Sequence, residues 1–241
     1  MLYLIGLGLY DEKDMTLRGL EAAKSCDKLY IERYTSAWHG LENLKVKLGK
    51  EIVEVRRKDL EEEQGKILEE AKSKVVGILV PGDPLVATTH IDILIQARKM
   101  GIKTSVVHAP SIYSAVGETG LFIYKFGKTT TIPFPEKGYE PQSPYDAIKE
   151  NKERGLHTLC LLDIKERPMT PREALEYLLK IEEKRREKVI TPGDKVIVFA
   201  VRERGSVTYD TVENLMKREF PTPAVIIIPG KLHSMEEEAL K

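Results

Sequence analysis

The sequence predicts an α/β protein with two domains. Short apolar runs alternate with segments of helical periodicity along the whole chain, which is typical of repeated strand–helix–strand units. The run Val75–Val80 is continuously apolar rather than alternating, as expected for a strand buried on both faces of a parallel sheet. A length of 241 residues suits two domains, and we place their boundary near Ala109-Pro110, giving domains at 1–109 and 110–241.

The first domain contains five expected strands and two expected helices. The strands are Leu2–Leu9, Leu29–Tyr34, Ile52–Val55, Val75–Val80 and Lys103–Val107. A helix from Thr16 to Cys26 follows the first strand and carries apolar residues on one face. A second helix, from about Leu85 to Met100, is expected to end at Gly101, because glycine commonly occupies the position just beyond a helix. This order predicts a mostly parallel sheet.

The second domain repeats this style, and we expect a mixed sheet in it. Its expected strands are Thr129–Ile132, Thr158–Leu162, Val196–Val201 and Ala224–Ile228. Ser143-Pro144 has the chemistry of a helix start, with Ser143 as N-cap and Pro144 at the first helical position. Thr170 and Glu173 predict a capping box at another helix. A last helix is expected from about Thr208 to Phe220.

The composition excludes several classes of protein. Lys plus Arg and Asp plus Glu number 38 each, so the chain lacks the basic excess with which nucleic-acid-binding proteins contact phosphates. No apolar stretch approaches the roughly 20 residues needed to span a bilayer, and the first strand begins too close to Met1 for a signal peptide. Cys26 and Cys160 lack the spacing of a disulfide framework or zinc site, and Cys160 is expected in the core. We therefore expect a cytoplasmic protein without a metal site and without nucleic-acid or membrane partners.

Gly6-Leu7-Gly8 directly follows the first strand. A dinucleotide site has a third glycine three residues later, and this chain has Asp11 there, so that fingerprint fails. Glu32 nevertheless stands at the end of the second strand, where it could mimic a ribose-binding acid. The two glycines are compatible with a simple tight turn and with close approach of the backbone to a ligand. The sequence contains no nucleophile elbow, Walker loop or HExxH motif.

Two more polar turns follow expected strands of the first sheet. Pro81-Gly82-Asp83-Pro84 follows the fourth strand, and His108-Ala109-Pro110-Ser111 follows the fifth. Asp83 and Ser111 are expected helix N-caps with free backbone N–H groups behind them, which suit a carboxylate or other anion. Open α/β sheets bind ligands at this edge, so the residues predict a cleft for a small polar ligand. The spacing fits Asp83 equally as a cap only and as a cap that also contacts the ligand.

Several stretches, taken together, resemble the diphthine synthases, a family within the tetrapyrrole-methylase-like superfamily. They are LYLIGLGLYDEKDMTLRGLEAAKSCD, VPGDPLVATTH, HAPSIYSAVGETGLFIYKFGKT, GLHTLCLLDIK and IIIPGKLH, in this order along nearly the whole chain. The combination of PGDPLVATTH with HAPSIYSAVG is specific, because a generic member of the superfamily would share little beyond the strand-end glycines and the Gly-Asp-Pro turn.

The resemblance implies two α/β domains of the tetrapyrrole-methylase type, with S-adenosylmethionine in the cleft between them and S-adenosylhomocysteine as its product. The implied cofactor contacts are Leu9, Asp83, Val86, Ser111, Ile112, Leu162, Arg204 and Ala224. Where the family usually has Ala-Arg-Ala-Gly-Ser, this chain has AVRERGS from Ala200 to Ser206, so Arg204 departs from the family pattern. The tail after His233 is also shorter than usual.

The reaction that the resemblance implies is successive methylation of the amino group of a 3-amino-3-carboxypropyl-histidine on translation elongation factor 2. In archaeal-type members it ends at the trimethylammonium product, diphthine, and the resemblance also implies a homodimer. The alternatives are a corrinoid or other tetrapyrrole methyltransferase on the same fold, and a cofactor-binding regulatory module without catalysis. The amine must be neutral to attack, and the sequence singles out no base among the candidates His90, His108 and Asp163.

Overall fold

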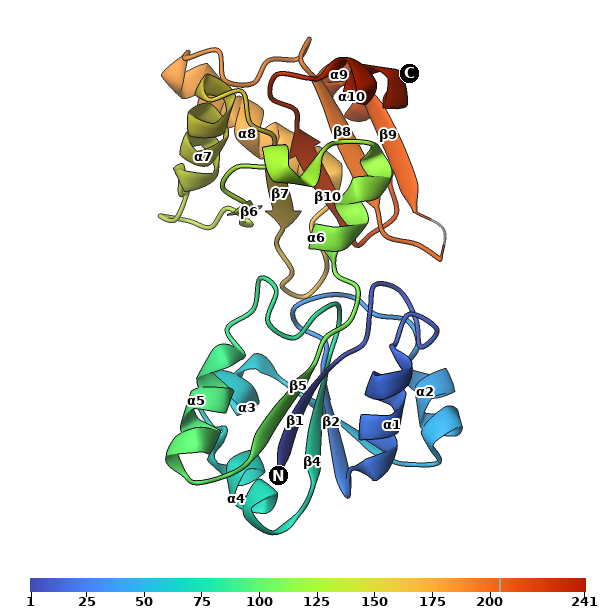
Figure 1. Ribbon diagram of the computed structural model, residues 1–241. Coiled ribbons are helices and arrows are strands. Elements are labelled where there is room, and N and C mark those ends of the chain that lie inside the picture. Colours follow the sequence, from blue (N-terminus) through green and yellow to red (C-terminus); the bar gives the residue numbers. More distant parts are fainter. Residues whose placement is uncertain (204) are drawn as a thin grey trace. The chain divides into compact units, whose positions relative to one another are not determined.

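A computed structural model describes residues 1–203 and 205–241 and divides the chain into two compact units, Met1–Ala115 and Val116–Lys241 (Figure 1). Each unit has its own five-stranded sheet and its own hydrophobic core, which confirms the predicted α/β class with two domains. The division lies a few residues after the expected boundary at Ala109-Pro110, because the short helix α6 (Ile112–Ala115) groups with the first unit.

The sheet of the first unit is entirely parallel. Its strands are β1 (Leu2–Gly6), β2 (Lys28–Glu32), β3 (Ile52–Val55), β4 (Val76–Val80) and β5 (Thr104–Val107). They lie in the order β3-β2-β4-β1-β5, so β1 lies between β4 and β5. All five predicted strands are confirmed. β1 is shorter than predicted, because the chain turns at Gly8, which forms an isolated bridge with Gly82.

Helices cover both faces of this sheet. They are α1 (Leu17–Ser25), α2 (Leu41–Leu48), α3 (Arg57–Glu61), α4 (Gly65–Ser73) and α5 (Ile91–Lys99). α1 and α2 lie on one face, and α3, α4 and α5 lie on the other (Figure 1). Thr16 caps α1 by accepting a hydrogen bond from the Gly19 N–H at 3.0 Å, and Gly101 follows α5 with a φ of 72°, as predicted. α2 and α4 follow Gly40 and Gln64 without a side-chain cap, so they lack the usual start signal.

The segment 81–90 is a loop, and the prediction that a helix begins near Leu85 is wrong. α5 begins only at Ile91. Asp83 therefore does not cap a helix. Its Oδ1 accepts a hydrogen bond from the Leu85 N–H at 3.0 Å in a local turn. Ala87 then has a φ of 56°, a left-handed conformation that a right-handed helix cannot contain.

The sheet of the second unit is mixed, as predicted. Its strands are β6 (Thr130–Ile132), β7 (Thr158–Leu162), β8 (Lys195–Ala200), β9 (Ser206–Thr211) and β10 (Ala224–Ile228), in the order β6-β7-β10-β8-β9. β6 and β7 pair in parallel, and the other pairs are antiparallel. The helix predicted from Thr208 to Phe220 is wrong over its first part. Residues 206–211 pair with β8 as β9, and only α9 (Val212–Leu215) is helical.

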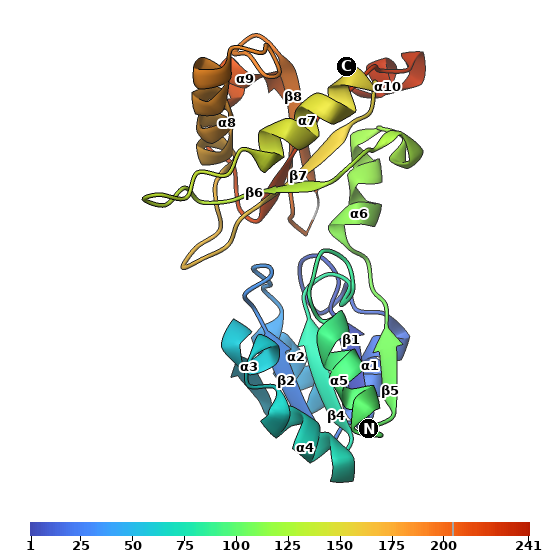
Figure 2. The same ribbon diagram turned by 90° about the vertical axis from the view of Figure 1, so that its left-hand side faces the viewer.

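The second unit also contains two short 3₁₀ helices, η1 (Val116–Thr119) and η2 (Ile123–Lys125). Its other α-helices are α7 (Ser143–Glu153), α8 (Pro171–Arg185) and α10 (Ser234–Ala239) (Figure 2). The capping box at α8 is confirmed, with the Thr170 N–H donating to Glu173 at 2.9 Å. The N-cap of α7 is Gln142, one residue before the predicted Ser143. Among the described residues, none of the helices is long and apolar enough to cross a membrane.

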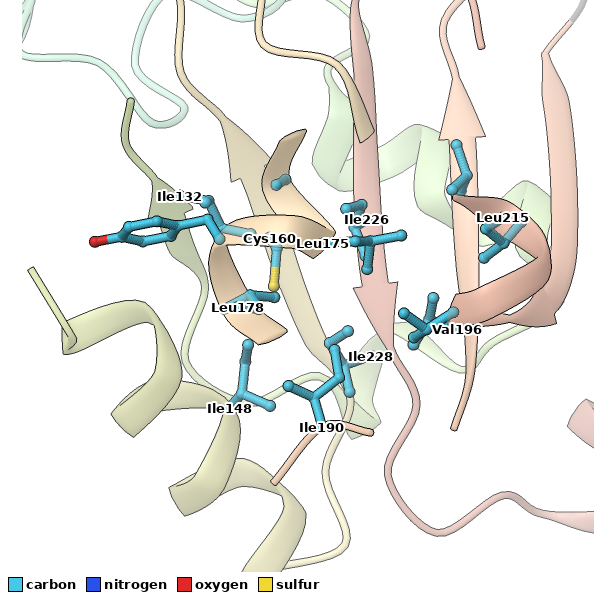
Figure 3. Close-up of a cluster of buried hydrophobic side chains, with 14 of the residues drawn as sticks. Ile132, Ile148, Cys160, Leu175, Leu178, Ile190, Val196, Leu215, Ile226 and Ile228 are labelled. Carbon is cyan, nitrogen blue, oxygen red and sulfur yellow. The ribbon is translucent and has the colours of Figure 1, made fainter. Parts of the chain in front are cut away.

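The core of the second unit lies between its sheet and α7, α8 and α9 (Figure 3). Ile226 and Ile228 of β10 enter this core, because alternate residues of a strand point to the same face. Cys160 of β7 is fully buried beside them, as predicted, and burial raises the pKa of its thiol to about 12. Leu175 and Leu178 of α8 cover this face (Figure 3).

Candidate active site

The carboxyl ends of three adjacent strands, β4, β1 and β5, lead into the three loops that carry the predicted cofactor residues of the first unit. These residues are Leu9 after β1, Asp83 and Val86 after β4, and Ser111 and Ile112 after β5. The first two loops are joined directly, because Gly82 donates to the Gly8 carbonyl at 2.8 Å and receives a bond from the Gly8 N–H at 3.2 Å. The structure therefore brings these positions together at one edge of the sheet.

Glycines allow the loops to approach so closely. A Cβ atom on Gly6 would lie 2.7 Å from the Cβ atom of Ala109 and 2.8 Å from the carbonyl oxygen of Gly82. Both distances are too short for a side chain at this position. Gly8 has a φ of 78°, the left-handed conformation that favours glycine. Beside Gly82 there is room, since an added Cβ would meet only the Cβ of Ser111, at 4.0 Å. The glycines thus provide both a tight turn and close backbone approach, here between loops of the chain itself.

Asp83 connects the loop after β4 to the loop after β5. Its side chain is 7% exposed, and its Oδ2 accepts hydrogen bonds from Nδ1 of His108 at 2.8 Å and from the Ala109 N–H at 3.2 Å. Its Oδ1 is held by the Leu85 N–H. The carboxylate therefore holds two loops together, a tertiary role in place of the predicted helix cap.

The rest of the loop after β4 is held in an unusual conformation. The Val86 N–H donates to the Asp83 carbonyl at 3.2 Å, and the Thr88 hydroxyl donates to the Pro84 carbonyl at 2.6 Å. Between them, Ala87 is left-handed, which costs a non-glycine residue roughly 1–2 kcal/mol. Backbone strain of this kind is concentrated at ligand-binding and catalytic sites, and it supports a functional role for this loop.

Ser111 lies at the predicted N-cap position, directly before α6, and its carbonyl accepts from the N–H groups of Ser114 and Ala115 at 3.0 and 2.9 Å. Its hydroxyl, however, makes no hydrogen bond to any described residue of α6. Its own N–H donates to the Ser114 hydroxyl at 3.1 Å. Since α6 is only four residues long and α5 begins at Ile91, the prediction of two helix N-termini facing one crevice is wrong.

The predicted residues of the second unit also gather at one edge. Leu162 ends β7, and Ala224 begins β10, the antiparallel neighbour of β7. The register pairs Leu161 with Val225, so Leu162 and Ala224 lie at the same end of this strand pair. Arg204 lies outside the residues that the structure describes.

Of the three candidate bases, His90 has both of its polar atoms engaged and Asp163 has one. His90 is 3% exposed, with Nδ1 facing the Pro84 carbonyl and Nε2 facing the Tyr34 hydroxyl, each at 3.3 Å. Burial lowers the pKa of His90. Asp163, which follows β7 in the second unit, accepts a hydrogen bond from the Phe134 N–H at 3.0 Å. His108 is the most exposed of the three, with 68% of its side chain exposed, and only its Nδ1 is engaged among the described residues.

Glu32 does not have the exposure of a ribose-binding acid. It is fully buried, and its carboxyl group accepts hydrogen bonds from the hydroxyl and N–H of Thr35 and from the N–H of Tyr34. Burial raises its pKa to about 7, although these hydrogen bonds act in the opposite direction. Its oxygens therefore serve its own turn, which removes the support for a nucleotide ribose at this position.

Comparison with known proteins gives one consistent result. The family model for tetrapyrrole (corrin/porphyrin) methylases matches residues 1–191. The chain belongs to this methylase family. It is 51% identical to the diphthine synthases of Methanococcus maripaludis strain S2 and of Methanocaldococcus jannaschii, over 251 and 253 residues, covering 100% of this chain and 98% of each relative.

A solved structure agrees with this membership. A crystal structure of a diphthine synthase is 39% identical and superimposes with a TM-score of 0.90, covering 99% of this chain and 94% of that one. The predicted family, fold class and enzyme class are therefore confirmed, and this methylase is a methyltransferase of diphthamide biosynthesis. A non-catalytic regulatory module and a corrinoid methyltransferase both lose support, because these relatives are all diphthine synthases.

Proposed function

We propose that this methylase transfers methyl groups from S-adenosylmethionine to the amino group of the 3-amino-3-carboxypropyl-histidine on translation elongation factor 2, giving diphthine. The observation that carries the proposal is the identity of 51% with diphthine synthases over the whole chain. The three joined loops after β4, β1 and β5 support it, because they form a backbone-rich edge of the kind that binds small ligands in parallel sheets.

The residues present fit the proposed cofactor. Bound S-adenosylmethionine supplies an electrophilic sulfonium methyl group. The open space beside Gly82, bordered by Ser111, leaves room for a ligand against the backbone of these loops. Leu9, Val86 and Ile112 are half-buried and line the same edge, which suits contacts to apolar parts of the molecule. Contacts at Leu162, Arg204 and Ala224, and a cofactor position in the cleft between the domains, stay predictions from the resemblance.

The main task of the chain in this reaction is alignment. Holding the amine in line with the methyl carbon and the sulfur supplies up to roughly 7–11 kcal/mol of barrier lowering in well-oriented systems. The loops after β1 and β4 are suited to this, because paired backbone bonds between Gly8 and Gly82 fix them to each other. No metal is needed for such a displacement. Among residues 1–203 and 205–241 there is no cluster of three or more metal-ligating side chains.

The number of methyl groups in the product tests the proposed reaction. Purified chain, S-adenosylmethionine and suitably modified elongation factor 2 are incubated, and the factor is followed by mass spectrometry. We expect additions of one, two and then three methyl groups, because a trimethylated nitrogen has no lone pair and cannot react again. A fourth methyl group on a carboxylate would contradict the archaeal-type reaction. A product that stops at one methyl group would favour the corrinoid-type alternative.

Two further expectations come from the sequence: the dimer from the resemblance, and the location from the composition. We expect a homodimer, which light scattering of the purified chain measures directly, and we expect a cytoplasmic location. Exposed apolar side chains of the second unit, at Ile123, Tyr124 and Met235, are compatible with a protein contact.

A further inference from the structure

We infer that His108 is the general base that removes a proton from the substrate ammonium group before methyl transfer. The inference rests on the proposed function, because it requires an amine as methyl acceptor. Aliphatic amino groups have reference pKa values of about 8 to 10, so near neutral pH the acceptor is mostly protonated and has no free lone pair. A positioned base typically contributes about 10²- to 10⁴-fold to the rate of such a step.

The hydrogen bonds of Asp83 determine which nitrogen of His108 carries the proton. Oδ2 of Asp83 already accepts from the Ala109 N–H and lies 2.8 Å from Nδ1 of His108. A carboxylate oxygen is an acceptor, so Nδ1 must donate, and a neutral imidazole then has its lone pair on Nε2. Within the described part of the chain, Nε2 has no hydrogen-bond partner, and 68% of the side chain is exposed. The ring is thus oriented by a carboxylate and open at the nitrogen that can accept a proton.

No other histidine of the chain combines these features. His90 and His157 are buried, and both ring nitrogens of each are engaged. Nδ1 of His233 accepts from the Met235 N–H in the second unit. His39 is exposed, but its ring packs at a tilt against Tyr10 with a centroid distance of 5.0 Å, and it has no carboxylate partner among the described residues. Among these histidines, only His108 combines a carboxylate partner on one ring nitrogen with an open second nitrogen, as a general base requires.

The position of His108 is also appropriate. It is the first residue after β5, at the same sheet edge as Leu9 and Gly82. Asp83 holds its ring through the loop after β4, so the base and the proposed cofactor loop are parts of one rigid arrangement. The same carboxylate stabilises the imidazolium that forms when the base accepts the proton.

The step is balanced without a further reactant. Nε2 of His108 takes a proton from the ammonium group, and the electron pair of the broken N–H bond stays on the amine nitrogen. That pair forms the new N–C bond to the methyl carbon, while the C–S bond breaks and leaves both electrons on sulfur. The positive charge passes from sulfur to nitrogen. The imidazolium then releases its proton to solvent before the next transfer.

A set of four proteins tests this role: the natural chain, His108→Gln, His108→Ala and the matched control His39→Gln. Single-turnover methyl transfer is measured against pH. We expect His108→Gln to be slower by about 100-fold or more, whereas the His39→Gln control stays within about threefold of the natural chain. The methyl-transfer rate of the natural chain should reach a plateau as pH rises. At the same pH the rate of His108→Gln should continue to rise, because the amine itself is still losing its proton. Added imidazole should restore part of the rate of His108→Ala.

Two readouts separate the base from binding and from the proposed function. Calorimetry should show that His108→Gln, whose side-chain amide can still donate to Asp83, binds S-adenosylmethionine within about twofold of the natural affinity. Nitrogen NMR of ¹⁵N-histidine-labelled protein, with the signal assigned by its loss in His108→Gln, should show the Nδ1–H form of His108 without any substrate. A protonated Nε2, a rate loss under about threefold, or a loss explained by weaker cofactor binding would each overturn the inference. Absence of transfer by the natural chain would instead contradict the proposed function, and the NMR result would still decide the geometry.

Discussion

The two units each contain a carboxylate hydrogen-bonded to a histidine, and the two pairs have similar lengths and opposite surroundings. Asp83 and His108 are 2.8 Å apart, with the histidine side chain 68% exposed. Glu236 and His157 are 3.0 Å apart, and neither side chain is exposed. A pair open to solvent can exchange a proton with a ligand, whereas a closed pair can only hold its surroundings together.

The hydrogen-bond partners show why the closed pair is structural. The Gly230 N–H donates to Nδ1 of His157 at 2.9 Å, so Nε2 carries the proton and donates to Glu236. This leaves the ring of His157 without a free lone pair, and burial lowers its pKa. Glu236 also accepts from Lys125 and from the N–H groups of Phe122 and His233, which fastens α10 to η2 and β7.

These partners also determine the charge of Glu236. Burial by itself raises the pKa of a carboxyl group. For Glu236, the bonds from Lys125, His233, Phe122 and His157 outweigh burial and lower the pKa to about 2. Glu32, equally buried but without a cation bonded to it among the described residues, has a pKa raised to about 7. In Glu236 the hydrogen bonds, one of them from a cation, outweigh burial, whereas in Glu32 burial outweighs the hydrogen bonds.

The largest expected effect comes from breaking the closed pair. Glu236→Ala should destabilise the second unit by about 3–5 kcal/mol, because it leaves Lys125 and buried N–H groups without their partner. The matched control Glu237→Ala, on the exposed side of α10, should change stability by less than about 0.5 kcal/mol. Hydrogen exchange with mass spectrometry resolves the two units, and the loss of protection should centre on β7, β10 and α10. Equal loss of protection in the first unit would contradict a local role.

The closed pair should also give the second unit a specific sensitivity to acid. The pKa of Glu236 is lower in the folded state than its ordinary 4.5, so its contribution to stability is complete above 4.5 and is lost as pH falls toward 2. The lowered pKa of His157 adds a loss that begins below its ordinary 6.5. Protection of β7 and β10, measured at stepwise lower pH, should fall in the natural chain. It should fall less steeply between pH 4.5 and 2 in Glu236→Gln, which cannot ionise.

The smallest effect on stability is expected at the open pair. Asp83→Asn retains an acceptor for some of its hydrogen bonds, so stability should fall by only about 1 kcal/mol. Affinity for S-adenosylmethionine should fall much more, because the loops after β4 and β5 are no longer held together by a carboxylate. Melting curves and calorimetry measure both, with the exposed Asp92→Asn as the control. Unchanged cofactor affinity in Asp83→Asn would leave this residue with a structural role only.

Local signals in the sequence were sufficient for much of the fold. The apolar runs of β3, β7 and β10 are placed correctly to the residue, since a buried strand needs a continuous or alternating apolar pattern. The Thr170–Glu173 capping box is also confirmed. Its two hydrogen bonds join residues only three apart, so the local sequence is sufficient to predict it. The sequence motifs PGDPLVATTH and HAPSIYSAVG correctly identified the family.

Long-range partners account for what the sequence alone could not show. Asp83 has the local chemistry of a helix cap, but the groups that bind its Oδ2 come from the loop after β5, 25 and 26 residues later in the chain. Residues 206–211 form a strand because β8 provides a neighbour for their backbone groups, which outweighs the helical periodicity of this segment. The sequence by itself therefore determined every described strand except β9, the strongest cap and the enzyme family. The tertiary structure decided which histidine faces solvent and which is sealed against a carboxylate, because burial and hydrogen-bond partners depend on residues far away in the chain.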